Sequence, residues 1–169
     1  MKKLAILFII LGGYSFTSNA QVQATAASTG VVITPIGITK TADLNFGNIA
    51  VSPTVAGTVV LVPAGTRTAT GGVTLPAAVG TVSAAAFTVT GDGSNTYAIT
   101  FPNPTVTLTD PVSTKTMTLG TLTSTPSSTG TLTSGSQNIT VGGTLSVAAA
   151  QQAGTYTSAT GLVVQVNYN

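Results

Sequence analysis

The stretch GTYTSATGLVVQVNYN, residues 154–169, carries the clearest structural signal in the chain. Its apolar and polar side chains fall largely on opposite parities, the apolar set being Leu162, Val164, Val166 and Tyr168. Successive side chains of a β-strand point to opposite faces of the sheet, so this alternation predicts a strand with one face in a core. We expect this terminal strand to be introduced by Gly154 and to cover residues 162–168.

The same alternation of apolar residues with Thr or Ser recurs along the chain. Thr and Val are restricted at χ1 and fit a pleated sheet, so the composition is typical of strands. We count about nine or ten short strands with turn signals between them and no amphipathic helical pattern, which is the signature of a β-sandwich or a barrel. The sequence therefore predicts an all-β, antiparallel protein.

Three local features refine this prediction. The strands 79–90 and 97–101 flank the turn Gly91–Asn95 and give the best candidate for a β-hairpin. Residues 123–135 are mostly polar and predict a loop, and the pair Gly142–Gly143 predicts a bulge or bend inside a late strand.

The N-terminus has the three parts of a secretory signal: Lys2 and Lys3, the apolar run Leu4–Leu11, and the small-residue cleavage site Ser18–Ala20. The apolar run is about eight residues long, against roughly 20 for a spanning helix. Without cysteine there is no lipid attachment site, and no membrane anchor is expected. The sequence predicts export to the periplasm, the cell surface or the extracellular space, with a mature chain from Gln21.

The chain lacks most of the residue types that enzymes use for catalysis, because it has no histidine, cysteine or glutamate. Zinc sites and Ser-His-Asp or Cys-His arrangements are thereby excluded, and we expect no enzyme, no metal site and no cofactor. A Ser113–Lys115 pair is best interpreted as a solvated strand edge. The three acids, Asp43, Asp92 and Asp110, all lie beside turn residues, where we expect them to cap the local backbone.

The mature chain is formally neutral, because removal of the leader leaves Lys40, Arg67 and Lys115 against three aspartates. Nucleic-acid binding needs clustered bases, so it is not expected. So few charges also give weak repulsion between molecules and poor solubility as a free monomer, which suits a protein that ends up in an assembly.

Four motifs together resemble a bacterial family of small secreted proteins of unassigned function, itself similar to the spore-coat-protein-U and archaic chaperone-usher pilin families. The resemblance covers essentially the whole mature chain. The motifs are LNFGNI at 44–49, FTVTG at 87–91 before YAITFP at 97–102, VGGTLSV at 141–147, and GTYT at 154–157 before VVQVNY at 163–168.

This resemblance implies an immunoglobulin-like, pilin-like β-sandwich of about seven to ten short strands that lacks one strand, which the next subunit's N-terminal extension supplies. It divides the chain into a signal peptide (1–20), an extension (21–34) and a sandwich domain (35–169). The candidate donor strand is 23–33, with Val31 and Ile33 as same-face anchors. The candidate chaperone and assembly strand is 162–168, whose penultimate Tyr168 and upstream Gly154 match pilin features.

The leading functional hypothesis is therefore a non-enzymatic fibre or pilus subunit whose partners are copies of itself or related subunits, a periplasmic chaperone and an usher. One alternative is a monomeric secreted adhesin that binds a glycan or surface polymer through Tyr97, Tyr156 and residues 123–135. A second is a small outer-membrane barrel, although several predicted strands are short for it. For the donor segment, the alternative is that it folds back as the first strand of a complete sandwich.

Overall fold

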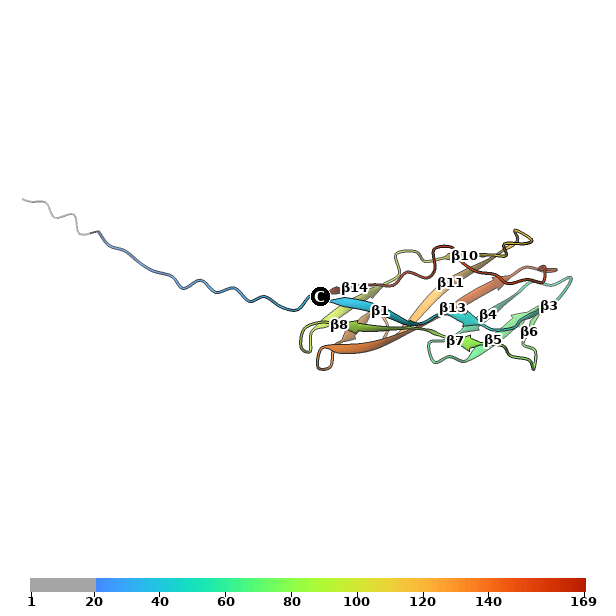
Figure 1. The fold of residues 1–169 in the computed structure, drawn as a ribbon, viewed down its shortest axis with the longest axis horizontal. Helices are drawn as coiled ribbons and strands as arrows, with labels where there is room; N and C mark the ends of the chain where they lie inside the picture. The colour runs from blue at the N-terminus through green and yellow to red at the C-terminus, as the bar shows by residue number, and fades with distance from the viewer. Residues whose placement is uncertain (1–20) are drawn as a thin grey trace, which may run out of the picture. The chain divides into compact units, whose positions relative to one another are not determined.

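The computed structural model describes residues 21–169, whose regular elements are all β-strands (Figure 1). Contacts divide the chain after Val32, and the folded body is the unit Ile33–Asn169. Residues 21–36 belong to no strand, and the first strand starts at Gly37. The described residues contain no helix that could cross a membrane. The predicted signal peptide lies outside them.

Two main antiparallel sheets form the body. The larger one has the order β1 (Gly37–Ala42), β8 (Ala85–Thr90), β13 (Ser136–Val147), β11 (Thr116–Thr125) and β10 (Val106–Thr109), with β4 (Gly57–Leu61) on β13 and β5 (Arg67–Gly71) on β4. The smaller one has the order β12 (Thr129–Thr131), β9 (Thr96–Thr100) and β14 (Gln165–Tyr168). Two short pairs complete the body: β2 (Asn45–Phe46) with β7 (Val82–Ser83), and β3 (Ala50–Val51) with β6 (Val73–Thr74).

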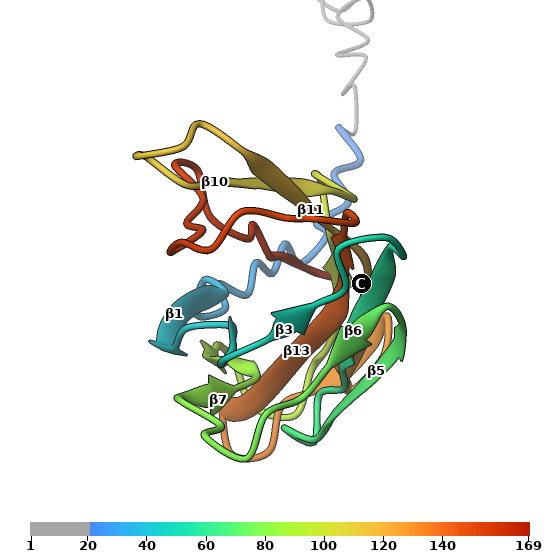
Figure 2. The same ribbon diagram turned by 90° about the vertical axis from the view of Figure 1, so that its right-hand side faces the viewer.

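The long strand β13 explains why the larger sheet is strongly curled (Figure 2). Along one side it pairs first with β8, over Ser136–Val141, and then with β4, over Gly143–Val147. At the changeover, a Cβ on Gly142 would lie 2.1 Å from the carbonyl oxygen of Leu61, so only glycine fits. The bulge or bend predicted at Gly142–Gly143 coincides with this changeover, but the extra residue is not in β13: the register shift opposite these glycines lies in the partner β11, between Gly120 and Thr123.

Two apolar clusters fill the body. One lies at the β4 end of the larger sheet, and the other joins the two sheets as the core of a sandwich. Their fully buried members include Val59 and Leu61 in the first, and Val89, Tyr97, Leu132, Ile139 and Val141 in the second. The inward residues alternate along each strand, as the sequence pattern predicts.

The predicted hairpin across Asp92–Asn95 is wrong. The turn itself is present, with the Asn95 amide donating to the Asp92 carbonyl oxygen at 3.3 Å, but β8 and β9 lie in different sheets. Both strands bury their apolar faces in the same cluster. Because alternation shows only that each strand has one buried face, it does not distinguish a hairpin from a crossing between two layers.

Two further predictions need correction. Residues 123–135 are not one loop, because they contain the end of β11 and all of β12, and Leu132 is buried. The final strand is shorter than expected and covers only Gln165–Tyr168. Its predicted inner face is nevertheless the covered one: Val166 is buried, and Leu162, Val164 and Tyr168 are half-buried against the core.

Candidate functional site

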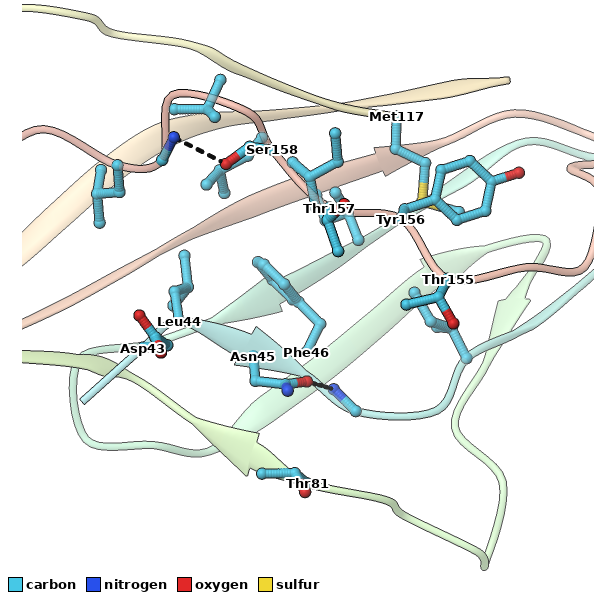
Figure 3. Close-up of a pocket in the computed structure, with 18 of the residues that line it drawn as sticks. Asp43, Leu44, Asn45, Phe46, Thr81, Met117, Thr155, Tyr156, Thr157 and Ser158 are labelled. Atoms are coloured by element: carbon cyan, nitrogen blue, oxygen red, sulfur yellow. Dashed lines mark hydrogen bonds between the residues drawn. The ribbon is translucent and has the colours of Figure 1, made fainter. Parts of the chain in front are cut away.

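An open groove of about 1170 Å³ lies on the body between two segments, residues 40–51 and 151–162 (Figure 3). Its floor consists of apolar side chains from β8, β10, β11 and β13: Phe87, Val106, Leu108, Met117, Leu119 and Leu145. The groove therefore opens directly onto the core of the protein, and the two segments form its walls.

The first wall is residues 43–51. Leu44 and Phe46 point into the groove and Asn45 points away, which is the alternation of an extended strand (Figure 3). Asn45 instead caps the next turn, its side-chain oxygen accepting from the Gly47 amide at 2.9 Å. In the part of the chain that the structure describes, this wall pairs only with β7 and β6, over two residues each.

Arg67 holds this wall from behind. Its guanidinium donates to the carbonyl oxygens of Phe46 and Asn48, the latter at 2.8 Å, and to that of Val79 at 3.3 Å. A planar fork with several donors suits such a cluster of carbonyls. The sequence analysis assigned Arg67 no role, although its being the sole arginine in an almost uncharged chain was an available signal.

The second wall is residues 155–162. Thr157 attaches it to β10 through two backbone hydrogen bonds with Thr109, of 2.8 and 3.1 Å. The Tyr156 ring lines the groove, and its hydroxyl donates to the Gln152 carbonyl oxygen at 2.7 Å. Within residues 21–169, no backbone hydrogen bond joins residues 158–164 to a neighbouring strand. In the described chain no strand lies between the two walls, and each wall turns once, at Gly47 in the first and over residues 158–161 in the second.

Asp110 lies close to the residue that precedes the second wall, Gly154. Its carboxylate is buried and accepts from the amide of Ser113 at 2.9 Å and from the Ser113 hydroxyl. A Cβ on Gly154 would lie 2.7 Å from this carboxylate, so the glycine permits the wall to approach. Asp110 caps its turn as predicted, and the Ser113 hydroxyl serves that cap.

These hydrogen bonds predict how stability depends on pH. Donation from the Ser113 side chain and backbone holds the pKa of Asp110 below its usual 3.8. A carboxylate with a depressed folded-state pKa stabilises the fold fully above about pH 4, and the contribution is lost as the pH falls through the folded-state pKa. We expect Asp110→Asn to remove this acid-range dependence, measured as the free energy of unfolding between pH 2 and 6. Parallel profiles for the two proteins would contradict it.

The other predicted site residues are separated by the fold. In the candidate donor segment, Val31 is 84% exposed and Ile33 47% exposed. Tyr97, proposed for a glycan-binding alternative, is fully buried, and its hydroxyl donates to the Gln137 side chain at 2.7 Å. Burial raises its pKa. Tyr97 is therefore a core residue and is not available to a surface polymer.

Comparison with known proteins finds one family whose profile covers most of the chain. It is described as a domain of unknown function, DUF4402, and it matches residues 36–168, which is close to the folded body. No curated protein matches the chain. No solved structure matches it either.

Proposed function

The chain belongs to the DUF4402 family, and from the groove we propose that it is an exported, non-enzymatic structural subunit of a pilus or surface fibre. In this proposal, each subunit has an immunoglobulin-like, pilin-like sandwich that lacks one strand. The N-terminal segment of the next subunit supplies the missing strand, so that subunits join head to tail.

The observation that carries the proposal is the open groove between residues 43–51 and 155–162. An added strand gains main-chain hydrogen bonds along an open edge, and its alternate side chains fill apolar pockets. Residues 158–164 have backbone groups without a strand partner in the described chain, and the floor supplies the apolar surface. Filling this groove would cover its half-buried apolar side chains, Leu44, Leu108 and Leu162 among them, which is favourable.

The occupant that fits best is residues 23–33 of a second copy. Eleven extended residues span roughly 36 Å at about 3.3 Å each, which is enough to run past the wall 43–51, because the turn at Gly47 keeps that wall shorter than the roughly 30 Å of nine extended residues. The segment has no charged residue, so burying it leaves no charge without a partner. Its larger apolar side chains are uncovered, Val32 being 99% exposed, and the same-face pair Val31 and Ile33 would be its anchors.

The remaining proposed partners, a chaperone and an usher, depend on export of the subunit. The signal peptide 1–20 would direct it to the periplasm, where a chaperone would protect the groove until an usher assembles the fibre. The proposal is tested by whether purified residues 21–169 form multimers that are lost when residues 21–33 are removed.

A further inference from the structure

The penultimate residue, Tyr168, joins the two ends of the folded body. Its hydroxyl accepts from the Asp92 amide at 2.6 Å and donates to the Thr34 carbonyl oxygen at 2.9 Å. A phenol has one proton to donate and lone pairs to accept, so both bonds form at once. We call these two hydrogen bonds the latch.

The surroundings of the latch are built for the tyrosine. A Cβ on Gly91 would lie 2.2 Å from the Tyr168 hydroxyl oxygen and 3.1 Å from the ring carbon that carries it. The Tyr168 ring packs on the cluster between the two sheets, and its backbone is in register with Tyr97 on β9. The hydroxyl is therefore held in place by both the ring and the backbone of its strand.

The chain on the other side of the latch is stiff. Thr34 precedes Pro35, which restricts Thr34 to extended conformations and fixes the φ angle of residue 35. Ile36 then packs against the core, and β1 starts at Gly37. The Thr34 carbonyl is thus the backbone group at which the body, through Tyr168, first holds the chain that follows the exposed segment.

We infer that the latch sets the boundary between the segment offered to a partner and the folded body. Residues up to Ile33 are available, whereas Thr34 and the strand that follows it are retained. Without the latch, the residues that lead into β1 lose their hydrogen bond to β14, and the N-terminal end of β1 separates from the body more often. Tyr168 is in this sense a positioning residue, because it acts on the donor segment through Thr34.

Limited proteolysis, at a protein concentration below that at which multimers appear, tests this inference. A protease that cleaves before large aliphatic residues has sites at Val31, Val32, Ile33, Ile36 and Ile38. In the unchanged protein, we expect trimming to stop with Ile33 as the new N-terminus. In Tyr168→Phe, we expect cleavage before Ile36 to be about tenfold faster, because cleavage follows the population of the open form. Mass spectrometry of the trimmed body identifies the boundary.

The matched control is Tyr156→Phe, which loses the hydrogen bonds of a tyrosine hydroxyl in the second wall of the groove. The inference is overturned if Tyr168→Phe is trimmed like the unchanged protein, or if the control shifts the boundary equally. Should Tyr168→Phe be digested completely, Gly91→Ala takes its place, because its methyl group crowds the hydroxyl while the tyrosine remains. Trimming of Gly91→Ala at Ile33 alone would then refute the latch.

The role of the latch in assembly rests on the proposed function, but the trimming experiment does not. Because it is performed on monomers, a shifted boundary without multimers would contradict the fibre and retain the latch. Multimers with an unshifted boundary would support the fibre and contradict the latch.

Discussion

Removal of residues 21–33 is expected to convert a multimer-forming protein into a monomer that keeps its fold. The deletion takes away the only segment proposed to fill a neighbour's groove, and it removes no described strand, since β1 starts at Gly37. Sizing by light scattering should show multimers for residues 21–169 and a single species for residues 34–169. Thermal unfolding of the shortened protein should remain cooperative.

A control of equal length separates the sequence of the segment from its presence. Replacement of residues 22–33 by Gly, Ser and Gln keeps the chain length and removes the anchors Val31 and Ile33. It should abolish multimers as completely as the deletion. If either variant still formed multimers of the original length, the subunits would be joined through another surface.

Leu44→Glu is expected to have the second largest effect, because it changes the groove and leaves the donor segment intact. Leu44 is half-buried, points into the groove and packs against both apolar clusters (Figure 3). A docked strand would cover the new carboxylate without a partner for it, at a cost of several kcal/mol. Association should weaken by at least about a hundredfold, measured as the concentration at which multimers appear.

Val62→Glu is the matched control for this variant. Val62 is 37% exposed, lies at the end of β4 and does not line the groove, so its replacement should leave association unchanged.

A mixture of two variants gives a sharper result: Leu44→Glu copies keep a donor segment and copies lacking residues 21–33 keep a groove. The two should combine one to one and go no further. Longer species from the mixture would be inconsistent with strand exchange.

The fold class and the inner faces of the strands follow from the sequence, whereas their partners do not. Alternation placed Leu162, Val164 and Val166 on one inner face, and Val166 is buried while the other two are half-buried. It could not show that β8 and β9 lie in different layers, because both contribute to the same cluster. The role of Gly142 was also hidden, since it depends on the approach of the β4 carbonyl of Leu61, which lies far away in sequence.

The candidate site shows the same division. The half-buried terminal face could be predicted from apolar residues and their spacing, whereas the donor segment follows only from the family resemblance and stays a prediction. The groove could not, because its walls come from opposite ends of the chain and its floor from four strands between them. Arg67 donates to backbone carbonyls of the first wall, and Asp110 accepts from the backbone amide of Ser113 in its own turn; the partners in such contacts leave no pattern in the sequence.

Electron cryomicroscopy of the assembled protein tests the central claim most directly, because it shows what lies between residues 43–51 and 155–162. We expect an added strand there, formed by residues 23–33 of the neighbouring copy, with Val31 and Ile33 directed toward the groove floor. A groove filled by the copy's own segment, an assembly joined through other surfaces with the groove empty, or a protein that stays monomeric would contradict the claim.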